Sequence, residues 1–168
     1  KPLGSISDLG TFSFHETKNI TSGEGGSLLV NKPHFVERAE IIREKGTNRS
    51  KFFRGEIDKY TWVDLGSSYL PSEIMAAFLF SQLQEAKAIT KSRLDIWNRY
   101  HKELEVLEEK ALIERPKIPS YCNHNAHMYY IILESLDVRN KFITYMKEEG
   151  IHCTFHYQPL HYLSLIHI

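Results

Sequence analysis

The sequence predicts an α/β fold, and three observations support this prediction. Two short stretches rich in β-forming residues, Leu9–Phe14 and Gly26–Asn31, flank a glycine-rich turn. From Ser72 to about Lys110, apolar residues recur at helical spacing. Near the C-terminus a strand-like, a helix-like and a second strand-like stretch follow one another, as in a small β–α–β unit.

The first two stretches are expected to form buried strands on either side of a functional loop. Leu9–Phe14 is aromatic and ends shortly before the turn-forming sequence SGEGG, residues 22–26. About ten residues separate the two strands, whereas most connections are shorter. Loops on a rigid scaffold commonly carry function, so this loop is the first place to look for a site.

The middle of the chain is predicted to be helical, with one irregular segment. Pro33 suits the first turn of a helix, and Gly46 suits its end. Residues 46–70 are polar but contain four large aromatic residues: Phe52, Phe53, Tyr60 and Trp62. Because such side chains are unusual in a solvated linker, we expect this segment to pack on something, such as a partner chain. The helical stretch from Ser72 is expected to bend and to link two lobes.

The C-terminal region is predicted to be a small lobe. The sequence AHMYYIIL, residues 126–133, is typical of a strand. A helix capped by Asp137 and closed by Gly150 is expected to follow. The sequence IHCTFHY, residues 151–157, is typical of a second strand.

Composition excludes several classes of function. Of 168 residues, 21 are Lys or Arg and 21 are Asp or Glu, so no net charge draws the chain to nucleic acid or to an anionic membrane. Cys122 and Cys153 are too few for a disulfide framework, which favours a reducing, cytoplasmic compartment. No apolar run approaches the roughly 20 residues that span a bilayer. The chain begins with Lys, so we expect it to be part of a longer protein.

Lys18 is the candidate reactive residue of the loop. A lysine that follows a buried strand is partly desolvated, which lowers its pKa and leaves an amine able to form Schiff bases with carbonyl compounds such as pyridoxal 5'-phosphate (PLP). Ser13, five residues earlier, offers a hydroxyl for a phosphate group. The glycines of GEGG allow close approach of a ligand, or simply form a tight turn. On spacing alone, a solvated surface lysine is the commoner case.

The nine histidines do not form a metal-binding pattern. His152 and His156 would share one face of a strand but lie about 13 Å apart at ~3.3 Å per residue, too far to bind one ion. The sequence contains no HExxH motif and no Cys/His quartet, so it predicts no zinc site. His156 alone either binds a ligand oxygen or is a hydrogen-bonded loop residue.

Three segments resemble the DegT/DnrJ/EryC1/StrS family of sugar aminotransferases. The sequence GTFSFHETKNITSGEGG, residues 10–26, is similar to the lysine signature of that family. The sequence SSYLPSEIMAAFLFSQL, residues 67–83, is similar to its turn-and-helix segment. The sequence GIHCTFHYQPLH, residues 150–161, is similar to its histidine-bearing element. The resemblance therefore covers nearly the whole chain.

The family consists of PLP-dependent enzymes of fold type I, and the resemblance implies a role for each matching residue. Lys18 corresponds to the Schiff-base lysine, which also moves protons. Ser13 corresponds to the serine that binds the cofactor phosphate. Tyr69 lies in the turn that reaches the cofactor from the neighbouring subunit of a homodimer, and His156 corresponds to the histidine near the sugar substrate.

The resemblance also implies the C-terminal portion of the fold, in four segments. Residues 1–70 would end the PLP-binding large domain, residues 71–115 would form the linking helix, and residues 116–161 would form a small α+β lobe. Residues 162–168 depart from the family pattern as an atypical tail. The N-terminal half of the family fold is absent from the sequence, including its phosphate loop and the aspartate that holds the pyridinium nitrogen.

The implied reaction transfers an amino group from glutamate to a dTDP-4-keto-6-deoxy-hexose, in the synthesis of a bacterial surface polysaccharide. Two alternatives remain open. One is a sister aminotransferase that uses another nucleotide or keto position. The other is a truncated chain without catalytic activity, or a binding module. We expect weak or no activity from this chain alone, because half of the cofactor pocket is missing.

Overall fold

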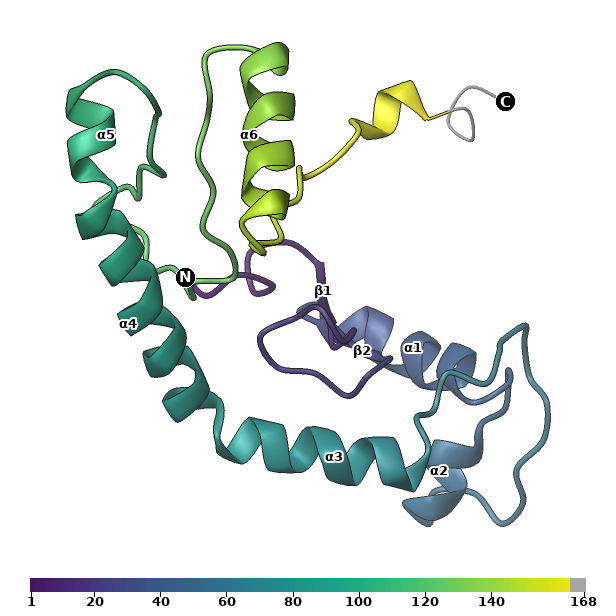
Figure 1. Ribbon diagram of the computed structural model, residues 1–168. Helices are drawn as coiled ribbons and strands as arrows, with labels where there is room; N and C mark the ends of the chain where they lie inside the picture. The colour runs from purple at the N-terminus through teal and green to yellow at the C-terminus, as the bar shows by residue number, and fades with distance from the viewer. Residues whose placement is uncertain (164–168) are drawn as a thin grey trace. The chain divides into compact units, whose positions relative to one another are not determined.

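The computed structural model describes residues 1–163 and divides into two compact units. The first unit contains residues 1–95 and 125–127, and the second contains residues 96–124 and those from 128 onward. Residues 164–168, most of the segment predicted to be an atypical tail, lie outside the described chain. Figure 1 traces the elements in chain order.

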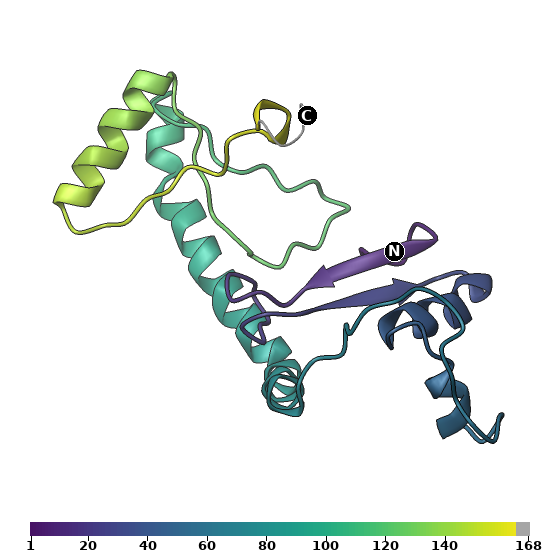
Figure 2. The same ribbon diagram turned by 90° about the vertical axis from the view of Figure 1, so that its right-hand side faces the viewer.

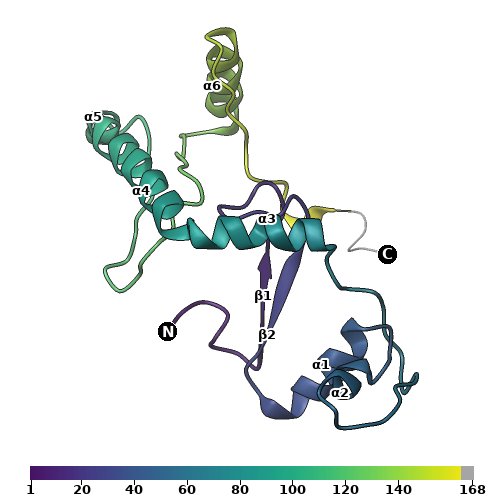
Figure 3. The same cartoon turned by 90° about the horizontal axis from the view of Figure 1, so that it is seen from below.

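The first unit contains both strands expected around the loop. Strands β1 (Leu9–Ser13) and β2 (Gly26–Val30) form a two-stranded antiparallel sheet in which Ser13 pairs with Gly26 (Figures 2 and 3). The expectation that these strands are buried is wrong, because Phe12 is 44% exposed and Leu28 is 51% exposed. Two strands alone are too few to cover their own side chains.

The helix predicted after Pro33 is confirmed. A 3-10 turn, η1 (Pro33–Phe35), leads into α1 (Val36–Arg43). Gly46 follows with a φ of +76°, a left-handed conformation that glycine adopts without strain, and a Cβ added there would meet the Asp64 carbonyl oxygen. The segment predicted to be irregular contains one short helix, α2 (Arg49–Phe53).

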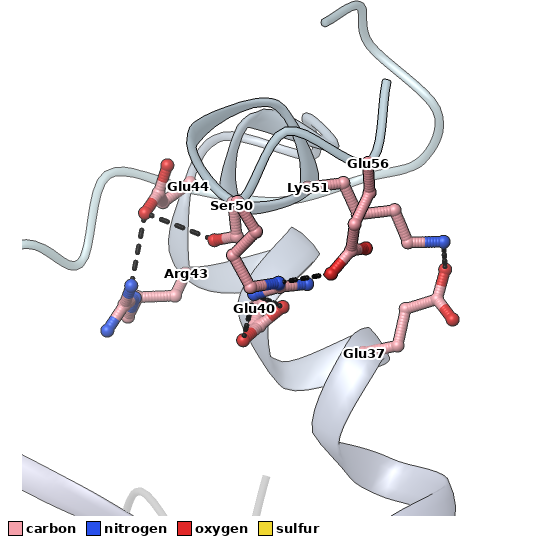
Figure 4. Close-up of polar contacts among 8 residues, drawn as sticks. Glu37, Glu40, Arg43, Glu44, Ser50, Lys51 and Glu56 are labelled. Atoms are coloured by element: carbon pink, nitrogen blue, oxygen red, sulfur yellow. Dashed lines mark hydrogen bonds and ion pairs between the residues drawn. The ribbon is translucent and has the colours of Figure 1, made fainter.

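Ion pairs join α1 to the segment around α2 (Figure 4). The Lys51 ammonium lies 2.5 Å from the Glu37 carboxylate, and Arg54 lies 3.0 Å from Glu40 and 2.6 Å from Glu56. The hydrogen bond to Glu37 raises the pKa of Lys51, and the hydrogen bond from Arg54 lowers the pKa of Glu56. Because solvent screens exposed pairs, each adds little stability, and their main effect is to orient the segment.

The long helical prediction is confirmed in three consecutive pieces. They are α3 (Glu73–Gln84), α4 (Ala86–Glu103) and α5 (Glu105–Glu109). Ser72 caps α3, where its Oγ accepts a hydrogen bond from the Met75 N–H at 3.3 Å. Within residues 1–163, no helix is long and apolar enough to cross a membrane.

The predicted β–α–β arrangement at the C-terminal end is wrong, since the described chain forms only its helix, α6 (Leu136–Glu148). Residues 126–133 make one isolated bridge, between Ile132 and Glu114, and residues 151–157 form no strand. An extended segment becomes a strand only where a neighbour satisfies its N–H and C=O groups along its length. The division into four segments is not tested by these elements and stays a prediction.

The start of α6 corrects one further expectation. Ser135, rather than Asp137, is the N-cap, and its Oγ accepts a hydrogen bond from the Val138 N–H at 3.3 Å. Asp137 lies in the first helical turn, where its carboxylate pairs with Lys141 at 2.7 Å. Serine and aspartate are both good cap residues, so the pattern alone did not separate them. The chain continues to a last 3-10 turn, η2 (Leu160–Tyr162).

Trp97 on α4 is the largest buried hydrophobic residue of the second unit, with 7% of its surface exposed. Its ring stacks on His101 at 4.7 Å between centroids. His124 and Tyr129 contact the Trp97 ring edge-on, at 4.5 Å and 5.2 Å. This aromatic cluster therefore joins α4 to the connector that follows α5.

Arg115 is the polar counterpart of that cluster, and its side chain is only 10% exposed. Its guanidinium donates to Glu108 at 2.7 Å, to Glu105 at 3.2 Å and to the carbonyl oxygen of His101. Hydrogen bonds from the backbone N–H and the guanidinium of Arg115 lower the pKa of Glu108. One side chain thus fixes the end of α4 and both ends of α5.

Replacing Trp97 with alanine should destabilise the second unit by about 3–5 kcal/mol, because the buried ring would leave a cavity. Urea denaturation followed by circular dichroism measures the change. The matched control is Trp62→Ala, since Trp62 is 73% exposed and surface substitutions stay within about 0.5 kcal/mol. Equal losses in the two variants would contradict the assignment of Trp97 to a core.

The free energy of unfolding should decrease at acidic pH because of Glu108. A carboxyl whose folded-state pKa is lowered stabilises the protein fully above its ordinary value of 4.5, and the effect is lost as pH falls through the lowered pKa. Melting temperatures of Glu108→Gln should therefore vary less with pH, between about 5 and 3, than those of the parent chain. Glu109→Gln, on the same helix, is the control and should keep the parent's slope. Identical slopes in all three proteins would refute the role of Glu108.

Candidate functional site

The loop between β1 and β2 is ordered by hydrogen bonds between its two arms. The Phe14 N–H donates to the Gly25 carbonyl at 2.8 Å, and the Ser22 N–H donates to the Phe14 carbonyl at 2.8 Å. The Thr21 hydroxyl donates to the same Phe14 oxygen and accepts from the Gly23 N–H at 2.9 Å. Gly23 and Gly25 have φ of +82° and +138°, which explains the glycines of the turn by backbone conformation.

Lys18 follows a tight turn within this loop. Its N–H donates to the His15 carbonyl at 2.9 Å. The His15 Nδ1 lies 3.0 Å from the Thr17 hydroxyl and accepts from the Thr17 N–H at 3.3 Å. The backbone at Lys18 is therefore held, while the residue itself is exposed. The expectation of partial desolvation is wrong in this chain, because the strand that leads to Lys18 is itself exposed.

Ser13 is the last residue of β1 and enters the same loop as Lys18. Its Oγ accepts a hydrogen bond from the His15 N–H at 3.4 Å, and Ser13 is exposed. The hydroxyl proton of Ser13 is thus still available to donate to an anion. The structure therefore places the two residues that the lysine motif singled out in one ordered stretch of the first unit.

Tyr69 belongs to the first unit but to a different segment. Its N–H donates to the Arg43 carbonyl at 3.1 Å, and the neighbouring Ser67 N–H donates to the Ile42 carbonyl at 2.9 Å. These hydrogen bonds hold the backbone of the segment against the end of α1. Tyr69 is nevertheless 67% exposed. A residue with a fixed backbone and a solvated ring is suited to contact a second molecule.

A pocket of about 140 Å³ lies beside this segment and was not foreseen from the sequence. It is lined by Arg43, Glu44, Lys45, Thr47, Arg49, Tyr60, Trp62, Ser68 and Leu70. The Glu44 side chain is 11% exposed and its Oε1 lies 3.0 Å from Arg43 (Figure 4). The buried Glu44 Oε2 and Arg49 Nε make no hydrogen bond within the described chain. The pocket is therefore lined by both charged and aromatic side chains.

His156 belongs to the second unit, in the segment that was expected to be a strand. It is exposed, and its ring lies 4.0 Å from the ring of Tyr157. The structure brings Ser13 and Lys18 into one loop of the first unit, whereas His156 belongs to the second unit. The roles assigned to Lys18, Ser13, Tyr69 and His156 stay predictions.

Sequence reasoning missed a polar group next to Lys18. The Asn19 Nδ2 donates to the Asn125 carbonyl at 2.7 Å, and the Asn19 Oδ1 lies 2.9 Å from the His127 Nδ1. Arg93 of α4 donates to the carbonyl oxygens of Ala126 and His127 at 3.1 Å and 2.6 Å. No local pattern predicts contacts between residues more than 100 positions apart, such as those of Asn19 with Asn125 and His127.

Comparison with known proteins places the chain in a large group of relatives. An uncharacterised protein from Methanocaldococcus jannaschii, MJ1066, is 34% identical over 167 residues, which are 96% of this chain and 42% of the relative. A UDP-4-amino-4,6-dideoxy-N-acetyl-beta-L-altrosamine transaminase from Campylobacter jejuni is 28% identical over 98% of this chain and 42% of the relative. The chain thus spans 42% of the length of these curated relatives.

Solved structures confirm the predicted α/β fold class, because the chain matches part of the fold of PLP-dependent aminotransferases. Helicobacter pylori PseC, an aminotransferase involved in the biosynthesis of pseudoaminic acid, matches with a TM-score of 0.83 and 22% identity over 98% of this chain and 43% of that chain. Spr1654 from Streptococcus pneumoniae, solved in a PLP-form, matches with a TM-score of 0.80 and 27% identity over 99% of this chain and 42% of that chain.

A family model covers residues 1–167, almost the entire sequence. Members of this family use PLP and act on nucleotide-linked sugars with an amino donor. On the extent of that match, the chain belongs to the DegT/DnrJ/EryC1/StrS aminotransferase family.

Proposed function

We propose that this chain is the lysine-bearing part of a PLP-dependent sugar-nucleotide aminotransferase and that Lys18 is its cofactor lysine. One observation carries the proposal: Lys18 is an exposed residue on a hydrogen-bonded turn, in the same ordered loop as Ser13. An accessible amine and a nearby hydroxyl on a fixed backbone are what a phosphorylated aldehyde requires.

The residues present fit PLP at two of the points that such a cofactor needs. Lys18 supplies the amine and Ser13 supplies a donor for the phosphate. When bound, PLP acts as an electron sink for the carbon that gains or loses the amino group. The Lys18 amine, once deprotonated, would be the base that takes a proton from that carbon, and its ammonium would then deliver the proton to a second carbon, so that the amino group changes place. Tyr69 and His156 would contact the cofactor phosphate and the sugar.

We propose glutamate as the amino donor and a dTDP-4-keto-6-deoxy-hexose as the acceptor. The sequence EKGTNRSKFFRGEIDKYTWVDLGSSYLPSEI, residues 44–74, resembles that of dTDP-4-amino-4,6-dideoxygalactose transaminase, an enzyme of enterobacterial common antigen synthesis. The names of two relatives give position 4 as the amino-bearing carbon of their own sugars, one UDP-linked and one dTDP-linked, which supports a 4-keto acceptor here. A sister enzyme for another nucleotide or keto position is the alternative. The whole protein would be a cytoplasmic homodimer.

A second candidate function is that of a non-catalytic fragment. The exposure of Phe12 and Leu28 on the sheet next to the loop favours it, since a working cofactor site is usually enclosed. In that case Lys18 would behave as one more surface lysine. A direct measurement of cofactor binding separates the two candidates.

Mixing the purified chain with PLP should produce the near-visible absorbance of lysine-linked cofactor, and Lys18→Ala should abolish most of it. Lys87→Ala, at an exposed position on α4, is the control and should leave the band unchanged. Borohydride reduction followed by peptide mass spectrometry identifies the lysine that carries the cofactor. Labelling spread evenly over the surface lysines would overturn the proposal and favour the non-catalytic fragment.

A further inference from the structure

We propose that Asn19 and His127 are positioning residues that hold the backbone at Lys18 in place. The inference rests on the proposed function, because it assigns these residues to the lysine of that site. Their side chains meet 2.9 Å apart although 108 positions separate them in the sequence. The pair lies wholly within the first unit.

Asn19 is held at both ends of its amide group. Its Nδ2 donates to the Asn125 carbonyl oxygen at 2.7 Å, and its Oδ1 faces the His127 ring. The Asn125 Oδ1 in turn accepts from the His127 N–H at 3.2 Å, so the three residues form a closed group. A side chain fixed at both ends leaves its own backbone little freedom.

This arrangement also determines which atom of each residue donates. The Asn125 carbonyl oxygen can only accept, so the atom of Asn19 that faces it is the amide nitrogen. The Asn19 oxygen must therefore face His127, whose Nδ1 must carry a proton in order to donate. Both the Nδ1–H tautomer and the protonated imidazolium meet this condition.

The base of the group is anchored by α4. Arg93 donates to the Ala126 and His127 carbonyl oxygens at 3.1 Å and 2.6 Å. Ala126 is 5% exposed and has a φ of +50°, a conformation that is unfavourable for alanine and needs support from its surroundings. The guanidinium of Arg93 thus fixes the segment from which Asn125 and His127 reach Asn19.

Lys18 therefore has a fixed residue on either side. On one side its N–H is bonded to the His15 carbonyl at 2.9 Å, and on the other its neighbour Asn19 is clamped. Lys18 itself is exposed. Restricting an otherwise exposed lysine in this way lowers the entropy that is lost when its amine captures a carbonyl compound.

Two substitutions at one position separate positioning from mere packing. His127→Gln keeps an N–H donor for the Asn19 oxygen, whereas His127→Leu fills similar space without a donor. The readout is the fraction of Lys18 labelled by limiting PLP and borohydride, mapped by peptide mass and normalised to Lys87. Melting temperatures are recorded in parallel, and His34→Leu, at an exposed histidine of η1, is the matched control.

We expect His127→Leu and Asn19→Ala to lower Lys18 labelling about fivefold to tenfold, the usual effect of losing one or two net hydrogen bonds. His127→Gln and His34→Leu should label like the parent chain. The double variant Asn19→Ala/His127→Leu should lose no more than the worse single one, because both remove the same contact.

The failures of the two proposals can be told apart. Strong labelling of Lys18 in the parent chain together with equal labelling in His127→Leu would overturn the positioning role and leave the proposed function standing. A parent chain in which Lys18 labels no better than Lys87 would overturn the proposed function and the inference with it. Equal losses in the Gln and Leu variants would mean that His127 acts through its volume, which also overturns the inference.

Discussion

The hydrogen bonds from Arg93 to the carbonyl oxygens of Ala126 and His127 are the contact on which the candidate site depends. They bind α4 to residues that lie 33 and 34 positions further along the chain. Those residues in turn fix Asn19, and Asn19 is covalently joined to Lys18. A planar guanidinium that donates to two successive carbonyls defines both distance and direction, which a lysine at position 93 would not do.

Polar contacts matter here because the described chain buries few side chains. Trp97, Ile113 and Ala126 are its buried hydrophobic residues, and none of its side chains is fully enclosed. The hydrophobic effect therefore supplies less of the tertiary order than in a compact domain of this length. In the second unit Arg115 has a role like that of Arg93, since its guanidinium donates hydrogen bonds to Glu105, Glu108 and the His101 carbonyl oxygen. The chain spans 42% of the length of the curated relatives it matches.

The parts that could be predicted from the sequence are those that are determined locally. Pro33 and Gly46 bracket a real helix, Ser72 caps the next one, and the strands around the lysine loop are present. The strands predicted at residues 126–133 and 151–157 failed, because a strand requires a pairing neighbour and pairing is not local. The same division holds within the site. Ser13 and Lys18 could be singled out as candidates because one short motif contains both, and their roles stay predictions. The contact of Asn19 with His127 has no signature at a separation of 108 residues.

The hydrogen bonds that hold Asn19 to Asn125 and His127 have a chemical property that suits the neighbouring Lys18. A lysine can act as nucleophile or base only when it has lost its proton, so the activity of such a residue changes with pH. If the hydrogen bonds that support the lysine also changed with pH, the position of the lysine and its protonation would change together. The His127 Nδ1 donates to the Asn19 oxygen both in the neutral Nδ1–H tautomer and in the protonated ring. The other hydrogen bonds of this group come from the side-chain amides, backbone groups and Arg93. The loop therefore combines a reactive amine with a support whose hydrogen bond from the His127 Nδ1–H is available in both protonation states of the ring.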